Sequence, residues 1–243
     1  MPRPPSHLRG IPSRGEGDGR PPETHRIPTL EDRYIPPLRY HFLTRFYDGV
    51  VRVTTRERTF KRMLVEQINA RPGERVLDLG CGTGTLAVAL ARRYPTAAIT
   101  GLDADADALA IARGKARSAG VLLSLERGRA ERLPFADASF DRIASSLLFH
   151  HLTPEQKAAA LREARRVLEP GGELHVADWG RPANALMRVA FFGVQLLDGF
   201  ETTADSVAGG LPELMARAGF AEVRETGSID TPAGTIRLHR ATK

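Results

Sequence analysis

Short apolar stretches alternate with helical patterns along most of the chain from residue 75 onward. Five apolar segments have the length of buried strands, and they lie at 75–79, 98–102, 122–125, 140–146 and 173–178. Helical patterns separate them at 86–93, 105–120 and 153–168. Because strands and helices that alternate at this spacing are joined by crossover connections, the pattern predicts a parallel sheet with helices on both faces.

Capping residues mark the ends of two of these helices. Asp105 stands at the start of one helix, and Gly120 follows its last turn. The run Thr153-Pro154-Glu155-Gln156 has the form of a capping box with proline at the first helical position.

Further elements flank the alternating region. Before it, apolar residues at a four-residue step predict a helix within 34–50, and Thr55 is expected to cap a second helix that ends near residue 68. After it, we expect helices over 183–197 and 211–218, and strands over 221–225 and 235–240 that pair antiparallel at one sheet edge.

These elements define the expected fold class and domain organisation. The fold class is α/β: a doubly wound, mostly parallel, seven-stranded Rossmann-like sheet with N-terminal helices and a lid insertion after strand five. Residues 1–29, rich in Pro, Gly and Arg, are expected to form a disordered basic tail. Residues 30–243 are expected to form one domain, with a helical cap at 30–72, a cofactor-binding core at 73–180, and the lid and C-terminal strands at 181–243.

Charge and cysteine content narrow the possible partners and location. The formal net charge is +6, which would suit nucleic acid, but the Arg residues are spread among Ala, Gly and Pro and favour a solvated basic surface. No apolar run is long enough to cross a bilayer, and the single cysteine, Cys81, favours a reducing cytoplasm. The sequence predicts no metal site and leaves the oligomeric state open.

A glycine-rich loop follows the first strand. Gly80, Gly82 and Gly84 are spaced G-x-G-x-G, and such glycines let the backbone approach a ligand at a helix N-terminus. The dinucleotide fingerprint G-x-G-x-x-G is one residue longer. Asp78, two residues before the loop, would repel a pyrophosphate and attract a cationic ligand. The loop therefore argues against an NAD-dependent oxidoreductase.

A second carboxylate, Asp103, ends the second strand. In α/β nucleotide folds an acid at this place binds both ribose hydroxyls. The alternative role for Asp103 is that of a helix cap. We favour the ribose role because the glycine loop and the acid occur together.

With these motifs the chain resembles the class I S-adenosylmethionine-dependent methyltransferases, and within them the branch with the ubiquinone/menaquinone-biosynthesis enzymes. The matching segments are 76–84, 101–103, 133–135, 139–141 and 166–172. The resemblance implies S-adenosylmethionine as cofactor and a small, partly apolar or lipid-like methyl acceptor. An RNA methyltransferase and a non-catalytic S-adenosylmethionine-binding module are the alternatives. The Asn/Asp-Pro-Pro-aromatic motif of many nucleic-acid methyltransferases is absent after the fourth strand.

The resemblance also implies roles for residues of the loop and the second strand. The backbone at Gly80 and Gly82 would face the methionine part of the cofactor, and Asp78 would act on its ammonium group. Thr83 would lie at the turn into the helix, and Asp103 would hold the ribose.

The adenine and methionine ends have further implied contacts. Ala130 would offer its backbone N–H to the adenine, and Ser146 would contact the methionine end. Family members commonly have Asp or Asn before the alanine, but this chain has Arg129. Glu131 could bind the adenine amino group instead, or Arg129 could stack on the ring.

Two histidines are the catalytic candidates. His150 and His151 follow the fourth strand at the carboxyl edge of the sheet, where ligands bind in this fold. One of them could act as a general base, because imidazole titrates near neutral pH. The alternative is that they fix the loop, since methyl transfer gains most from positioning and exclusion of water.

Two apolar walls are expected to close the acceptor site. One comes from the N-terminal helices and the other from the segment after the fifth strand, and their residues are Phe42, Phe46, Tyr47, Phe191, Phe192 and Leu196. The cysteine of the glycine loop, Cys81, is expected to fill space rather than react.

Overall fold

The structure is a computed structural model that describes residues 56–198 and 208–243. The expected tail over 1–29, the helix expected within 34–50, and Thr55 lie outside the described residues, as do the apolar residues proposed for the N-terminal wall. The structure begins with the second of the two expected N-terminal helices, α2 (Glu57–Ile68).

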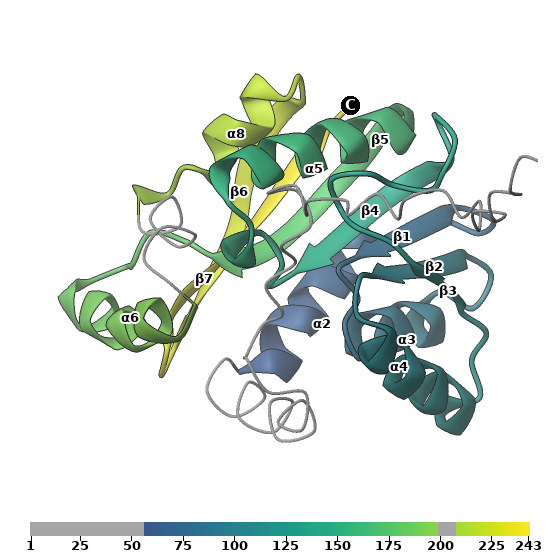
Figure 1. Ribbon diagram of the computed structural model, residues 1–243, viewed down its shortest axis with the longest axis horizontal. Helices are drawn as coiled ribbons and strands as arrows, with labels where there is room; N and C mark the ends of the chain where they lie inside the picture. Colours follow the sequence, from purple (N-terminus) through teal and green to yellow (C-terminus); the bar gives the residue numbers. More distant parts are fainter. Residues whose placement is uncertain (1–55, 199–207) are drawn as a thin grey trace, which may run out of the picture. The chain divides into compact units, whose positions relative to one another are not determined.

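Within the described residues, seven strands form one sheet in the order β3-β2-β1-β4-β5-β7-β6 (Figure 1). The strands are β1 (Arg75–Leu79), β2 (Ala98–Asp103), β3 (Ser124–Arg127), β4 (Phe140–Ser146), β5 (Leu168–Trp179), β6 (Ala221–Thr231) and β7 (Gly234–Thr242). The first five are parallel, and β7 runs antiparallel to both of its neighbours. The predicted fold class and the antiparallel pair at the sheet edge are confirmed.

The strand order reverses between β1 and β4. The chain moves outward from β1 to β2 and β3, and then returns to place β4 on the other side of β1. In open α/β sheets this reversal opens a crevice at the carboxyl ends of the strands, where ligands bind. The glycine loop follows β1 and therefore lies at this crevice.

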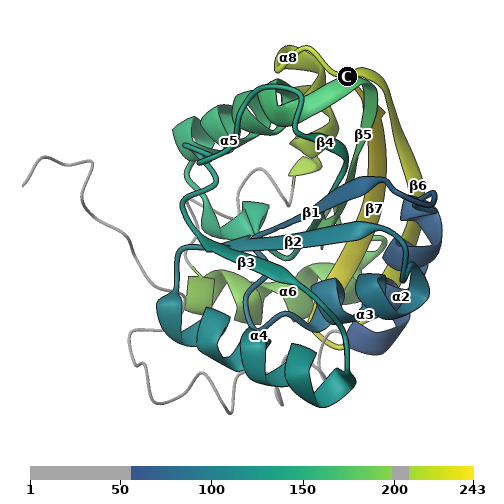
Figure 2. The ribbon, with the colours of Figure 1, turned by 90° about the vertical axis from the view of Figure 1, so that its right-hand side faces the viewer.

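Helices cover both faces of the sheet (Figures 1 and 2). On one face lie α2, α3 (Thr85–Arg93), α4 (Ala106–Ala119) and α6 (Ala185–Asp198), and on the other lie α5 (Pro154–Val167) and α8 (Leu211–Arg217). Each face has its own apolar core. Phe60 and Leu64 of α2 are buried in the first core, and Leu161 of α5 and Met215 of α8 are buried in the second. No helix in the described ranges has both the length and the apolar character needed to span a bilayer.

The capping predictions are confirmed at two helices. The side chain of Asp105 accepts hydrogen bonds from the second and third residues of α4. Thr153 and Gln156 form the reciprocal capping box at the start of α5. These caps satisfy backbone N–H groups that the first helical turn leaves without partners.

Several predicted boundaries are wrong, each for a physical reason. The third strand was expected at 122–125 but begins at Ser124, because Leu122 lies 94% exposed in the connection after α4 instead of pairing in the sheet. The fifth strand was expected to start at residue 173 but starts at Leu168. The Pro-Gly-Gly run forms a bulge inside this strand instead of separating it from the preceding helix. The sixth strand extends to Thr231, and two register shifts disguise its alternation.

One residue of the expected acceptor walls is not at a surface. Phe191 of α6 is fully buried and packs against Trp179, with 5.4 Å between the ring centroids. Among the α6 side chains that the structure describes, the exposed apolar ones are Leu186, Val189 and Phe192. The side chain of Leu196, also expected in this wall, lies outside the described ones. The prediction of an apolar wall from Phe191 is therefore wrong, because this face of α6 anchors the helix to the sheet.

The packing of α2 can be tested by truncating Phe60, which is fully buried. Phe60→Ala should lower the free energy of unfolding by about 3–5 kcal/mol, because it leaves a cavity in the core. Arg62→Ala on the same helix removes a side chain that is 72% exposed and should change stability by less than about 0.5 kcal/mol. Urea denaturation measures both, and equal effects would mean that α2 does not pack on the sheet.

Candidate functional site

The three loop glycines exclude a side chain for different reasons. Gly82 has a φ of +51°, and a Cβ atom there would meet nothing within 4 Å. At Gly80 a Cβ would lie 2.8 Å from Cδ1 of Leu148, and at Gly84 it would lie 2.7 Å from Cβ of Ala112. All three have a positive φ, +72° at Gly80, +51° at Gly82 and +77° at Gly84, which side chains rarely adopt and which fits the prediction of a glycine-dependent loop. Only Gly82 borders open space, whereas the other two make room for neighbouring elements.

Asp103 ties the glycine loop to the end of β2. Its Oδ2 accepts a hydrogen bond from the backbone N–H of Gly82 at 2.7 Å, and its Oδ1 accepts one from Asp105 at 2.9 Å. Asp105, not Asp103, is the N-cap of α4. Burial raises the pKa of the Asp103 carboxyl, and the backbone donors partly oppose this shift. Each oxygen retains a second lone pair that a ligand hydroxyl can reach.

A lysine supports the turn into α3. Nζ of Lys115 on α4 donates to the hydroxyls of Thr83, at 2.7 Å, and Thr85, at 3.0 Å. Thr83 thus lies at the predicted turn, and its side chain joins the loop to α4.

The carboxylate of Asp78 is the unusual group of this site. Asp78 is completely buried at the end of β1, and neither of its oxygens has a hydrogen-bond partner among the described residues. Burial raises the pKa of this carboxyl to about 7, and Asp103 acts in the same direction. The charge of Lys61 on α2 and the nearby backbone N–H of Ala87 on α3 oppose this shift. Because a buried carboxylate without a partner is unfavourable, this position favours a positively charged ligand group.

The residues of the loop therefore fit the methionine part of S-adenosylmethionine. Its ammonium group would give the Asp78 carboxylate the partner that the described chain lacks. The open space at Gly82 lets a ligand approach the backbone. A dinucleotide offers a pyrophosphate at this place, which the negative charge of Asp78 would repel.

The segment expected to bind the adenine follows β3. Ala130 is buried, and it lies between Arg129 and Arg132, which form an isolated β-bridge. A guanidinium nitrogen of Arg129 pairs with Oε1 of Glu131 at 2.8 Å. The two side chains considered for the adenine contact are thus joined to each other.

The end of β4 brings Ser146 and the loop after it towards the glycine loop. Ser146 pairs with Ala177 of β5 and is half-buried. The next residue, Leu147, has a φ of +55°, an unusual value for a leucine. This turn leads to Leu148, whose side chain packs over Gly80.

His150 forms a buried pair with Asp178 of β5. Nδ1 of His150 lies 2.6 Å from Oδ1 of Asp178, and each side chain is only 2% exposed. Asp178 also accepts hydrogen bonds from the backbone N–H groups of Phe149 and Trp179. Burial opposes the ionisation of Asp178, but His150 and the Trp179 N–H group lower its pKa below the ordinary value.

His151 lies beside this pair, with 3.9 Å between its ring centroid and that of His150. Burial, together with the neighbouring His150 ring, lowers the pKa of His151 well below its ordinary value. His151 is therefore neutral at pH 7. The two histidines both lie in the short 3-10 helix η3 (Phe149–His151), but only His150 pairs with Asp178.

Cys81 has the surroundings expected of a residue that fills space. It is buried beneath the loop, and a Cβ atom at Gly101 would lie 2.9 Å from its Sγ. Burial raises the pKa of its thiol, and the nearby carboxylates of Asp78 and Asp103 add to this. A protonated, enclosed thiol is a poor nucleophile.

Sequence reasoning missed Asp178 as a site residue. A signal was present, because acids end three of the parallel strands at the same sheet edge: Asp78 at β1, Asp103 at β2 and Asp178 at β5. Within the described part of the chain, no cluster of three or more His, Cys, Asp or Glu could hold a metal ion.

Comparisons with known proteins agree with this geometry. A family model described as a methyltransferase domain matches residues 76–172. The chain is 32% identical over 207 residues to the ubiquinone/menaquinone biosynthesis C-methyltransferase UbiE of Shewanella pealeana, and the match covers 76% of this chain and 80% of that protein.

Two solved structures show the same fold. The YcgJ protein of Bacillus subtilis matches with a TM-score of 0.63 at 19% identity, over 75% of this chain and 97% of that one. The S-adenosylmethionine-dependent methyltransferase SibL, in its apo form, matches with a TM-score of 0.64 at 24% identity, over 82% and 57% of the two chains.

Removing the charge of Asp78 should stabilise the ligand-free protein. The pKa of this acid is about 7 in the folded state, far above its ordinary value of 3.8, so ionisation destabilises the fold as pH rises from about 4 through 7. Asp78→Asn should therefore raise the melting temperature at pH 8 by about 5 °C. Near pH 3, where the carboxyl is mostly neutral in both states, the gain should largely disappear.

Differential scanning calorimetry at the two pH values measures this effect. Asp107→Asn, at an exposed position in the first turn of α4, is the matched control and should show no such gain at pH 8. A fall in melting temperature of Asp78→Asn at pH 8 would show that the carboxylate has a partner in the free protein.

Proposed function

The chain belongs to the class I S-adenosylmethionine-dependent methyltransferases, and from this we propose that it methylates a small, partly apolar acceptor. The observation that carries the proposal is the buried, unpartnered carboxylate of Asp78 beside the open backbone at Gly82. When bound, S-adenosylmethionine supplies a methyl group on a sulfonium centre. The protein's own residues must bind this cofactor, orient the acceptor and exclude water.

We propose that the predicted cofactor contacts operate along one sheet edge. Asp78 binds the ammonium group, and Asp103 binds the ribose hydroxyls while it holds the Gly82 N–H. Ser146 approaches the methionine end from β4, and the Ala130 N–H binds the adenine. The Arg129–Glu131 pair takes the place of the acid or amide common in the family, with Glu131 as acceptor for the adenine amino group.

We propose His150 as the general base and Asp178 as its positioning residue. The hydrogen bond at Nδ1 fixes the tautomer of the imidazole, so that Nε2 is the nitrogen that takes a proton from the acceptor. Neutral His151 beside it adds no positive charge that would oppose this protonation. The alternative role, fixing the loop, is supported by the burial of His150.

The acceptor wall after β5 is proposed to come from α6. Leu186 and Val189 are more than two-thirds exposed, and Phe192 is about half exposed. Exposed apolar residues at this spacing lie on one side of a helix and suit contact with an apolar molecule.

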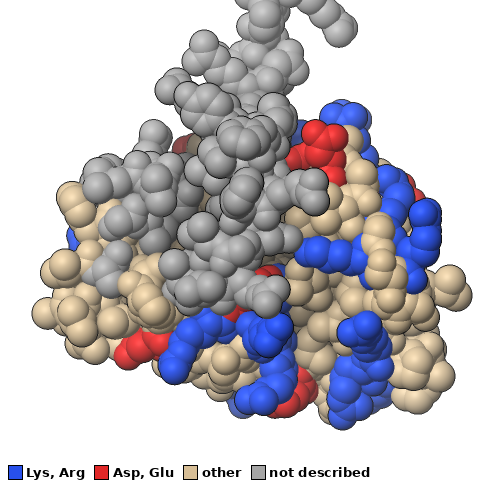
Figure 3. Space-filling model, turned by 90° about the horizontal axis from the view of Figure 1, so that it is seen from below, with Lys and Arg blue, Asp and Glu red and all other residues tan. Residues whose placement is uncertain are grey.

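The relatives suggest the acceptor class. The relative from Shewanella is named for C-methylation in ubiquinone and menaquinone biosynthesis, so we propose a quinone-like aromatic ring as acceptor. The basic charge keeps RNA as the second candidate. On the face seen in Figure 3, Lys and Arg side chains lie in separate groups among acidic and uncharged ones, which favours the small acceptor. A cytoplasmic location stays a prediction, based on the single cysteine.

Calorimetry tests the cofactor proposal. The protein should bind S-adenosylmethionine and S-adenosylhomocysteine but not NAD. Asp103→Ala should weaken S-adenosylmethionine binding about 10- to 100-fold, because it leaves ribose hydroxyls without an acceptor. Asp107→Ala, in the first turn of α4, should bind as the wild type does. Binding of NAD alone, or equal affinity in both variants, would contradict the proposed site.

Transfer of a radiolabelled methyl group tests the acceptor proposal. A short-chain alkyl hydroquinone should become labelled and pass into organic solvent, whereas total RNA should remain unlabelled. His150→Gln should lower kcat and leave the affinity for S-adenosylmethionine unchanged. Label found only in RNA would make RNA the acceptor.

A further inference from the structure

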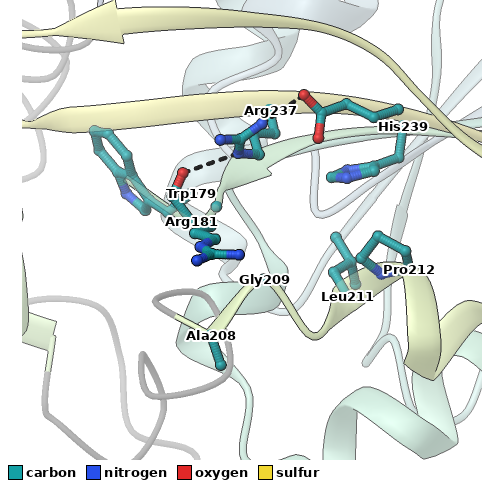
Figure 4. Close-up of a pocket in the computed structure, with 10 residues that line it drawn as sticks. Trp179, Arg181, Ala208, Gly209, Leu211, Pro212, Arg237 and His239 are labelled. Carbon is teal, nitrogen blue, oxygen red and sulfur yellow. Dashed lines mark hydrogen bonds and ion pairs between the residues drawn. The ribbon is translucent and has the colours of Figure 1, made fainter. Parts of the chain in front are cut away.

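A separate pocket of about 310 Å³ lies beyond the cofactor crevice, between β5, β7 and the start of α8 (Figure 4). The side chains that matter most for its chemistry are Trp179, Arg181, Leu211, Glu225, Arg237 and His239. None of these residues belongs to the proposed cofactor site. The pocket therefore combines apolar side chains, those of Trp179 and Leu211, with the guanidinium of Arg181 and the imidazole of His239.

The pocket is close to the proposed base. Arg237 of β7 lies directly across from Asp178 of β5, the residue that holds His150. Since β5 separates β7 from β4, the β7 side of the pocket with Arg237 and His239 lies two strand spacings from β4, or about 10 Å, and Trp179 of β5 lies one spacing away. A molecule of moderate length can therefore reach from the pocket to the end of β4.

His239 is a buried polar group without a partner in this pocket. Its side chain is 3% exposed, and its Nδ1 has no hydrogen-bond partner among the described residues. Figure 4 shows the imidazole directed into the pocket. Burial lowers the pKa of His239, with Arg237 acting in the same direction and Glu225 and Asp178 opposing it. The neutral ring needs a hydrogen-bond partner that the protein does not supply.

The positive charge of the pocket is only partly balanced. The guanidinium of Arg237 pairs with Glu225 at 2.5 Å and donates to the backbone oxygen of Arg181 at 2.9 Å. The side chain of Arg181 has no ion pair among the described residues and is exposed. One positive charge is thus left for a ligand, while Trp179 and Leu211 provide apolar contacts.

We propose that this pocket binds the carboxylate of the methyl acceptor, with Arg181 as its ion-pair partner and His239 as a hydrogen-bond donor. This inference rests on the proposed function and narrows its substrate class to an aromatic acid. The acid group and the methyl-accepting atom lie about 10 Å apart, which is the distance that separates the pocket from β4. The net charge of the pocket selects a monoanion over a neutral amide.

Benzoate and its neutral analogue benzamide are the probes. Titrations followed by calorimetry and by the imidazole ¹⁵N signals of His239 should show benzoate binding and much weaker benzamide binding. Arg181→Gln should weaken benzoate binding about tenfold, because it removes the positive charge while keeping a polar side chain. Arg217→Gln on α8, whose side chain is 72% exposed and outside the pocket, should bind like the wild type.

A second measurement tests whether the pocket belongs to the acceptor. A hydroquinone whose side chain ends in a carboxylate about 10 Å from the ring should be methylated with a lower KM than the matching terminal amide, and Arg181→Gln should remove this difference. Equal benzoate affinity in wild type and Arg181→Gln, or equal KM values for the acid and the amide, overturns the inference.

The benzoate experiments can fail without contradicting the proposed function, and the proposed function can fail without affecting benzoate binding. Loss of S-adenosylmethionine binding or of methyl transfer would contradict the function. Benzoate binding does not depend on either result, so its failure in a protein that still binds the cofactor contradicts only the acid pocket.

Discussion

The burial of a carboxylate without a hydrogen-bond partner at the end of β1 is the constraint on which the rest of the site depends. Asp78 occupies the centre of the sheet, where solvent does not reach. The described chain offers its carboxylate no hydrogen bond of normal geometry, but only the charge of Lys61 and the nearby backbone N–H of Ala87. Such a group is unfavourable in the free protein. Its presence is explained if a cationic group of a ligand pairs with the carboxylate. The free protein is then less stable than it could be, and the ligand-bound protein is not.

The elements around Asp78 serve this arrangement. β1 carries the carboxylate to the crevice where the strand order reverses, and the loop after it opens to a ligand only at Gly82. Asp103 holds the Gly82 part of the loop in place, and Leu148, which follows β4, packs over Gly80. Farther along the same edge, the charge changes sign from the acids of β1 and β2 to Arg181 and Arg237 near β5 and β7. A cationic cofactor and an acidic acceptor would each find the opposite charge.

The sequence predicts those parts of the fold that local patterns determine. β1 and β4 have the predicted bounds because each has buried apolar residues at its centre and lies in the middle of a parallel sheet. The third strand was displaced because Leu122 is apolar yet exposed, and the lengths of β5 and β6 were underestimated because bulges interrupt their alternation. The partnership of His150 with Asp178, the burial of Phe191 and the acid pocket depend on tertiary contacts between distant segments.

The pH dependence of S-adenosylmethionine binding tests the role of Asp78 most directly. Because the pKa of Asp78 is about 7 in the free protein, the affinity should rise about tenfold per pH unit from pH 5 to pH 7 and then level off. Above about pH 8 it should fall, as the α-amino group of the ligand loses its proton. Asp78→Asn should abolish the rise in affinity between pH 5 and pH 7 and keep the fall above pH 8. The same rise in affinity between pH 5 and pH 7 in wild type and Asp78→Asn would contradict this role of Asp78.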